Sequence, residues 1–282
     1  MNGERVSIHY KKPTEKGRRQ GNASSFIQEM TDHKSRVVAE DPDAFAHSEV
    51  YLKVRSVIRK HASFVIPIWR RIKRIAWRLR FHSPKRRFEE IYLTNTWACE
   101  ESRSGEGSSI SATTKTREAI IDFVKSHGIK SILDIPCGDY NWMKEVPFQG
   151  KYIGGDIVAQ VIDQNQKRHG SENRRFQLLD ITKGPFPECD LILSRDCLNH
   201  LAFCDIQRAL KNLFKSNAKF LALTNFPLQK VNRNQESGFV YRELNFHRPP
   251  FGLPEPMVDY NEETHPGKHL AFWRLADLKN IK

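Results

Sequence analysis

The sequence has no apolar segment long enough to cross a lipid bilayer. One of its longest apolar runs extends only from residue 64 to residue 69, whereas a membrane-spanning helix needs about 20 residues. The first twenty residues are charged and no apolar segment follows them, so no secretory signal is expected. Asn2 follows the initial methionine, which excludes N-myristoylation.

Cysteine is scarce and forms no CxxC pair. The five cysteines are odd in number, which argues against a disulfide framework and for a reducing, cytoplasmic environment. Cys197, His200 and Cys204 are spaced i, i+3 and i+7, which on one continuous helix would place two thiols and an imidazole on one face. No fourth ligand is evident, so we expect buried cysteines there and predict no metal site.

Basic residues are concentrated in the first third of the chain and are not balanced there by acidic ones. The net charge of +13 arises from 46 basic and 33 acidic residues among 282, and residues 1–90 alone hold 21 Lys and Arg against 10 Asp and Glu. The remaining residues are almost neutral. The sequence therefore predicts a basic N-terminal extension over residues 1–90, beginning with a disordered tail, and a main domain over residues 91–282.

Residues 68–81, IWRRIKRIAWRLRF, have the pattern of a basic amphipathic helix. Three interpretations are open: the helix binds an anionic membrane surface, packs on the main domain with its arginines in water, or follows nucleic-acid phosphates. Nucleic acid is the least favoured, because few aromatic residues alternate with the charges. We expect a cytoplasmic protein, with peripheral membrane contact through this helix as the alternative.

Short apolar runs alternate with helical stretches from residue 130 onward. The strand candidates are residues 131–135, 151–156, 174–180, 190–194, 219–224 and 271–275. Helices are expected over residues 158–169 and 205–216, and a further helix ends at Gly128. Apolar strands separated by helices predict an open, doubly wound α/β sheet, mostly parallel, covered on both faces. Such sheets bind ligands beyond the carboxyl ends of their strands.

An aspartate closes each of the first three predicted strands: Asp134, Asp156 and Asp180. Asp156 follows Asp134 by 22 residues, and a carboxylate about 20 residues after the first strand is the ribose acceptor of nucleotide-binding sheets. A carboxylate at Asp180 can accept a hydrogen bond from an exocyclic amine such as that of adenine. Taken singly, each aspartate is better explained as a helix N-cap, but three at successive strand ends with this spacing favour cofactor binding.

The phosphate-binding motifs GxGxxG and GxxxxGK[ST] are both missing. Without them, neither a dinucleotide pyrophosphate nor a triphosphate is supported as the ligand, and a nicotinamide oxidoreductase is disfavoured. An adenosine ligand without phosphates agrees better with the carboxylates at the strand ends.

Five segments carry a family resemblance: ESRSG, SILDIPCGDYNWM, YIGGDI, LLDIT and CDLILSRDCLNHL. Over about residues 92–278 they resemble the class I S-adenosylmethionine-dependent methyltransferases, most closely a bacterial group of unassigned substrate. The resemblance implies a Rossmann-like sheet of seven strands and S-adenosylmethionine as the cofactor. Pro136 and Tyr140 stand where glycines are usual in the family.

The resemblance also implies which residues contact the cofactor. The loop after the first strand approaches its amino acid end, the acidic residue that closes the second strand holds the ribose, and the end of the third strand meets the adenine. These residues are Asp134, Pro136, Cys137, Gly138, Asp156, Ile157, Asp180 and Ile181.

The carboxyl end of the fourth strand carries the candidates for the reacting end of the site. Methyl transfer needs mainly positioning, and a base only where the acceptor must lose a proton. Asp196 is predicted as the base or orienting group, and His200 is the alternative because its reference pKa is near neutral. Arg195 lies beside them and is counted with the cofactor contacts. Arg103 is predicted to pair with the cofactor carboxylate, which a guanidinium matches with two hydrogen bonds.

The predicted function is S-adenosylmethionine-dependent methyl transfer to an unidentified acceptor, with a small molecule favoured over nucleic acid. The alternative is a methyltransferase fold without activity that serves as a membrane-associated binding module.

Overall fold

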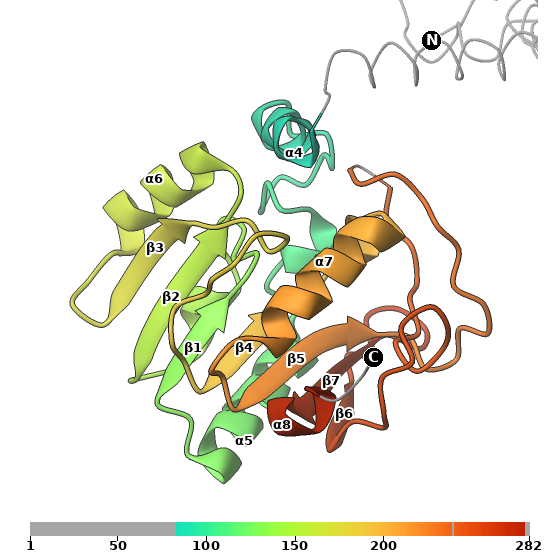
Figure 1. Cartoon of the computed structure of the whole chain (residues 1–282). Helices are drawn as coiled ribbons and strands as arrows, with labels where there is room; N and C mark the ends of the chain where they lie inside the picture. Colours follow the sequence, from blue (N-terminus) through green and yellow to red (C-terminus); the bar gives the residue numbers. More distant parts are fainter. Residues whose placement is uncertain (1–82, 239, 280–282) are drawn as a thin grey trace, which may run out of the picture. The chain divides into compact units, whose positions relative to one another are not determined.

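A seven-stranded sheet forms the centre of the computed structural model, which describes residues 83–238 and 240–279. Its strand order is β3-β2-β1-β4-β5-β7-β6 (Figure 1). β7 is antiparallel to β5 and β6, and all other pairs are parallel. The predicted Rossmann-like, mostly parallel sheet of seven strands is confirmed. The basic helix predicted over residues 68–81 lies outside the described residues.

The strands agree closely with the predicted ones, with one addition. They are β1 (Ser131–Asp134), β2 (Lys151–Asp156), β3 (Arg174–Leu178), β4 (Leu191–Ser194), β5 (Phe220–Asn225), β6 (Val258–Asn261) and β7 (His269–Arg274). β6 is the strand that the sequence does not predict. It has only four residues, VDYN, and these contain no apolar run from which a strand could be predicted. None of the four is fully buried.

Helices and short 3-10 segments connect these strands. They are α4 (Pro84–Leu93), η1 (Glu106–Ser108), α5 (Thr114–His127), η2 (Met143–Glu145), α6 (Ala159–His169), η3 (Leu198–His200), α7 (Phe203–Phe214) and α8 (Leu275–Leu278). As predicted, α5 ends at Gly128, whose left-handed φ of 60° suits glycine. None of the helices in the described ranges is long and apolar enough to span a membrane.

Helix α4 is absent from the sequence-based prediction, although its start signal is present. The Ser83 hydroxyl accepts a hydrogen bond from the Arg86 N–H, and Pro84 occupies the first turn. The helix crosses the domain boundary predicted at residue 90. In Figure 1 it lies above the carboxyl ends of the central strands.

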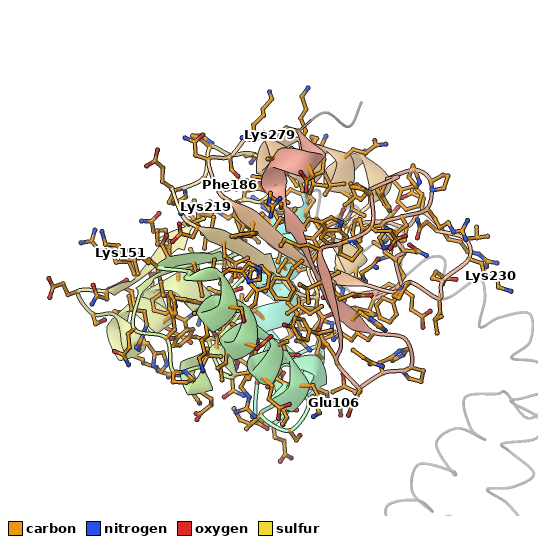
Figure 2. The ribbon with its side chains drawn as sticks, turned by 90° about the horizontal axis from the view of Figure 1, so that it is seen from below. Glu106, Lys151, Phe186, Lys219, Lys230 and Lys279 are labelled. Atoms are coloured by element: carbon orange, nitrogen blue, oxygen red, sulfur yellow. The ribbon has the colours of Figure 1, made fainter. Side chains whose placement is uncertain are left out.

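The sheet is covered on both faces, and each face has its own apolar core. On one face, Phe123 of α5 and Ile162 of α6 pack against sheet residues that include Phe272 of β7. On the other face, Ile206 and Leu213 of α7 pack with strand residues and with the connection between β5 and β6. That connection carries Lys230, which projects outward in Figure 2.

The connections reverse direction between β1 and β4. η2 and α6 follow β1 and β2 in the chain, and residues of both pack in the same core as α5, whereas α7 follows β4 and packs in the opposite core. In an open α/β sheet, this reversal opens a crevice beyond the carboxyl ends of the two adjacent strands, where ligands bind. The opposite edge holds the amino ends, marked by Lys151 and Lys219 in Figure 2.

Candidate active site

A cavity of about 810 Å³ lies at the carboxyl ends of β1, β2 and β4. This volume is within the range of small-molecule and cofactor sites, about 300–1,000 Å³. The sequence-predicted residues in its lining are Arg103, Pro136, Cys137, Gly138, Asp156, Ile157, Asp180, Ile181, Arg195, Asp196 and His200. Residues from segments far apart in sequence are thus brought to one place, and Asp134 is the one predicted site residue outside the lining.

Asp156 ends β2 and is held by backbone groups. Its Oδ2 accepts a hydrogen bond from the Gly138 N–H at 3.2 Å, and its Oδ1 accepts one from the Val158 N–H at 2.9 Å. Burial raises the pKa of this carboxyl to about 6. A carboxylate oxygen has room for a second donor. Asp156 can therefore accept a hydrogen bond from a hydroxyl group in the cavity.

The loop after β1 approaches the cavity closely at Gly138. This residue has a φ of 52°, and a Cβ atom there would lie 2.3 Å from the Ser104 Oγ. Ser104 has little freedom to move, because its hydroxyl donates to Asp139 and accepts from the Asp139 N–H. Glycine is thus required by both the backbone conformation and the space.

Gly138→Ala is expected to destabilise the protein by at least about 1 kcal/mol more than Gly128→Ala. Both glycines have positive φ, but nothing lies within 4 Å of a Cβ at Gly128, so the difference isolates the clash with Ser104. Urea unfolding of the two variants measures it. Equal losses would show that Ser104 gives way without cost.

Hydrogen bonds join the ESRSG segment to the PCGDYNWM loop beside the cavity. The Asp139 carboxylate accepts hydrogen bonds from the Ser102 hydroxyl and from the Arg103 N–H, at 2.9 and 2.8 Å. Glu101 accepts from the Asn141 amide at 2.6 Å and from the Ile110 N–H at 2.7 Å. The ESRSG segment is thereby fixed against the PCGDYNWM loop.

Asp180 follows β3 and has local partners. Its Oδ1 accepts hydrogen bonds from the Thr182 N–H and hydroxyl, and Lys183 lies 3.2 Å from its Oδ2. Burial alone would raise the pKa of Asp180, but these bonds hold it below its ordinary value. The side chain closes a turn with Thr182, and Asp180 lines the cavity together with Ile181.

Asp134 lies beneath the site. It is 1% exposed, and its Oδ2 accepts a hydrogen bond from the Tyr152 hydroxyl at 2.7 Å. Burial raises the pKa of Asp134 to about 7. In this structure Asp134 is bound to Tyr152 within the sheet, and its predicted contact with the cofactor remains a prediction.

Asp134→Asn is expected to reduce the loss of stability that occurs between about pH 4 and pH 7. Because the folded-state pKa is raised, the folded protein binds more protons than the unfolded chain in this window, so stability falls as pH rises. Asparagine keeps an oxygen for Tyr152 but has no charge to bury. Urea unfolding at pH 5 and pH 8 tests this: the wild type should lose more stability than the variant. A parallel loss would contradict the assignment.

Arg195 lies at the centre of a buried charge network. Its Nη2 donates to Glu262 Oε2 at 2.6 Å, its Nε donates to both Glu262 oxygens, and its Nη1 donates to the Gly107 carbonyl at 2.8 Å. The guanidinium lies over the Trp142 ring, 5.5 Å from its centroid. Burial opposes the charge on Arg195, but the carboxylates of Asp196 and Glu262 outweigh it and raise its pKa.

Asp196 is engaged through both carboxylate oxygens. Oδ2 accepts from Lys268 Nζ at 2.6 Å and lies 3.1 Å from Arg195 Nη1, while Oδ1 accepts from the Tyr241 hydroxyl at 2.9 Å. Burial disfavours its charge, but Arg195 and Lys268 outweigh it and hold the pKa of Asp196 well below its ordinary range. A carboxylate so stabilised is a weak proton acceptor, but it holds its hydrogen-bond partners firmly in place.

His200, in η3, lies among aromatic rings at the edge of the cavity. The ring centroids of Trp97 and Tyr241 are each 5.2 Å from its own. Its Nδ1 is buried and no described residue lies in hydrogen-bond geometry to it. Burial lowers the pKa of His200, and the Asp196 carboxylate acts in the opposite direction.

Arg103 is held by backbone oxygens. Its Nη1 donates to the carbonyls of Tyr92 and Leu93 at 3.2 and 3.3 Å, so the loop is fastened to the end of α4. The exposed side chain still lines the cavity. Its predicted pairing with a cofactor carboxylate remains a prediction.

The spacing of Cys197, His200 and Cys204 does not place them on one continuous helix. η3 ends at His200 and α7 begins at Phe203, and Cys204 is exposed. Among the residues that the structure describes, no three His, Cys, Asp or Glu side chains are grouped to hold a metal ion.

Sequence reasoning missed several residues that line the site. They are Phe88, Tyr92, Trp142, Tyr241, and Lys268, and behind Lys268 the network residue Glu262. The Ser-Pro start of α4 could have revealed Phe88 and Tyr92. Glu262 and Lys268 stand on either side of the β6–β7 turn, where nothing in the local pattern distinguishes them from solvated charges.

The comparisons with known proteins agree with this geometry. Residues 132–218 match a family model described as a methyltransferase domain, which is less than a third of the chain. No curated protein matches the chain.

Solved structures resemble the chain at low identity. They include the methyltransferase domain of bacterial CtHen1 (14% identity, 58% of this chain and 99% of that one, TM-score 0.43). Another is the N-methyltransferase NodS from Bradyrhizobium japonicum with S-adenosyl-L-homocysteine (16% identity, 48% of this chain and 73% of that one, TM-score 0.41). A third is human N-acetylserotonin methyltransferase with S-adenosylmethionine (16% identity, 65% of this chain and 61% of that one, TM-score 0.40).

The strand order, with β7 inserted antiparallel between β5 and β6, defines a Rossmann-like fold, and its cavity lies beyond β1, β2 and β4, where such sheets bind ligands. Within this fold, residues 132–218 match the methyltransferase domain, which agrees with the predicted resemblance to the class I S-adenosylmethionine-dependent methyltransferases.

Proposed function

We propose that this protein transfers a methyl group from S-adenosylmethionine to a small-molecule acceptor. One observation carries the proposal: a single cavity is lined both by Gly138 and Asp156 and by His200 and Tyr241. Direct transfer requires the donor and the acceptor to share one space in a fixed orientation.

The residues present fit the adenosine part of this cofactor. Asp156 has accepting capacity left for a ribose hydroxyl, Gly138 allows close approach of a ligand to the backbone, and Ile157 with Ile181 offers apolar surface for a base. When bound, S-adenosylmethionine supplies a methyl group activated by its sulfonium sulfur.

The two candidate catalytic residues then take different roles. Asp196 is saturated by Lys268, Arg195 and Tyr241, so it positions Tyr241 and the end of β4. His200 has a lowered pKa and no charged partner bound to its ring, so at neutral pH the unprotonated ring nitrogen can accept the proton of an acceptor. We therefore assign His200 as the base and Asp196 as the orienting residue.

The test uses the full chain in two steps. Calorimetry should show micromolar binding of S-adenosylhomocysteine, and incubation with methyl-labelled S-adenosylmethionine and an extract of the source cells should label a small molecule. Failure to bind S-adenosylhomocysteine would refute the proposal. Binding without any labelled product would favour the inactive binding module instead.

A further inference from the structure

Part of the cavity lining is an aromatic wall, formed by Phe88, Trp97, His200 and Tyr241. All four line the cavity. The His200 ring contacts the other three, with centroids at 5.2 Å from Trp97 and Tyr241 and at 6.4 Å from Phe88. The His200 ring is inclined by 41° to Trp97 and by 70° to Tyr241, so the wall presents both ring faces and ring edges, which suits stacked and edge-to-face contacts with an aromatic partner.

The wall is fixed in place by hydrogen bonds from two directions. The segment that carries Tyr241 is joined to η3, because the Gly238 N–H donates to the His200 carbonyl at 2.9 Å and the Arg242 N–H donates to the Asn199 carbonyl at 3.2 Å. The Tyr241 hydroxyl is bound to Asp196. A surface held in this way is preorganised for a rigid ligand.

The charges beside the wall neutralise one another. Arg195 and Lys268 face the carboxylates of Asp196 and Glu262, with nitrogen to oxygen distances of 2.6 to 3.2 Å. This network therefore offers neither a free carboxylate to an ammonium group nor a free cation to an anionic acceptor. The acceptor that suits this wall is neutral.

His200 provides a hydrogen-bond acceptor in the wall, where Trp97 carries only an N–H donor and the Tyr241 hydroxyl is bound to Asp196. The charged groups that act on its ring are the Asp196 carboxylate, which favours its protonation, and the Arg242 guanidinium, which opposes it, but burial dominates and lowers the pKa. A neutral imidazole has one nitrogen that accepts a hydrogen bond. A hydroxyl group on the acceptor is the matching donor.

We propose that the acceptor is a neutral, planar aromatic compound with a hydroxyl group, which stacks on the aromatic wall and donates its hydrogen bond to His200. This inference rests on the proposed function. In the reaction, the hydroxyl oxygen forms the new bond to the methyl carbon as the carbon–sulfur bond breaks and its electron pair returns to sulfur. The hydroxyl proton passes to the unprotonated ring nitrogen of His200.

The experiment measures binding of small probes to the full chain saturated with S-adenosylhomocysteine, by ligand-observed NMR. The probes are 2-naphthol, its saturated analogue decahydro-2-naphthol, 2-naphthylmethylammonium and 2-methoxynaphthalene. We expect 2-naphthol to bind about fivefold to tenfold more tightly than the saturated analogue and the ammonium. It should bind about fivefold more tightly than the methoxy compound, which has no hydrogen to donate.

Two variants locate the effect. His200→Phe keeps a ring in the wall and should remove the difference between 2-naphthol and 2-methoxynaphthalene. Trp97→Ala should weaken 2-naphthol by about fivefold while Trp97→Phe largely preserves it. Unchanged binding of S-adenosylhomocysteine by each variant verifies that the protein is folded.

The outcomes separate the two proposals. Binding of the ammonium or of the saturated analogue as tightly as 2-naphthol would overturn this inference, as would the absence of 2-naphthol binding, and both would leave the proposed function standing. Failure of the wild type to bind S-adenosylhomocysteine would refute the proposed function itself.

Discussion

Asp156→Ala is expected to weaken S-adenosylhomocysteine binding by about 10-fold to 100-fold. A hydrogen bond to a charged group contributes about 1.5–3 kcal/mol, and each 1.4 kcal/mol is a factor of ten in affinity. The variant loses the acceptor for the ribose, and it also releases the N–H groups of Gly138 and Val158, which the carboxylate holds at 3.2 and 2.9 Å. Both effects act on the same end of the cavity.

Asp156→Asn is the matched control, because it keeps one accepting oxygen and the size of the side chain. It should retain more affinity than the alanine variant. Calorimetry with S-adenosylhomocysteine measures both, and urea unfolding checks that each variant is folded. Undiminished binding by Asp156→Ala would rule out the ribose assignment, whatever happened to the acceptor.

The part of the site that was predictable from sequence follows one physical rule. Parallel strands end at a common edge, so residues that close successive apolar runs must lie near one another. Asp156 and His200 follow from this rule, whereas Gly138 was implied by the family resemblance, and the structure places all three in the lining of one cavity. The rule says where a residue lies along the strand but not which way its side chain points. For that reason Asp134, which also closes a strand, was expected in the site and lies beneath it, bound to Tyr152.

The part of the site that was not predictable from sequence depends on contacts between distant segments of the chain. Glu262 and Lys268 reach Arg195 and Asp196 across 67 and 72 residues, and a charged residue in a turn has no local pattern that indicates burial. Tyr241 is similar, since it stands in an irregular connection. Helix α4 differs, because Ser83 and Pro84 form a recognisable helix start in the sequence. The more basic stretch before it obscures this signal.

Glu262→Ala is expected to destabilise the protein by about 3–5 kcal/mol, the cost of removing one partner from a buried ion pair. Glu262 is 1% exposed and accepts hydrogen bonds from Arg195, and it also lies 3.2 Å from Lys268 Nζ. Its removal leaves two buried cations facing the single carboxylate of Asp196. Urea unfolding at neutral pH measures the loss, and Glu255→Ala is the control, because the Glu255 side chain is 89% exposed and its loss should cost less than about 0.5 kcal/mol.

A double variant separates the loss of charge balance from the loss of the side chain itself. Glu262→Met combined with Lys268→Met removes one charge of each sign and leaves Arg195 paired with Asp196 at 3.1 Å. Buried ion pairs replaced by apolar side chains of similar size are often neutral in stability, so the double variant should recover at least half of what Glu262→Ala loses. If the double variant is no more stable than Glu262→Ala, the shape of the β6–β7 turn, and not the balance of charge, is what Glu262 maintains. In the double variant the Asp196 carboxylate still accepts the hydrogen bond from Tyr241, so we expect the aromatic wall to keep its arrangement. In Glu262→Ala, where the buried charges are unequal, we expect this arrangement to be lost.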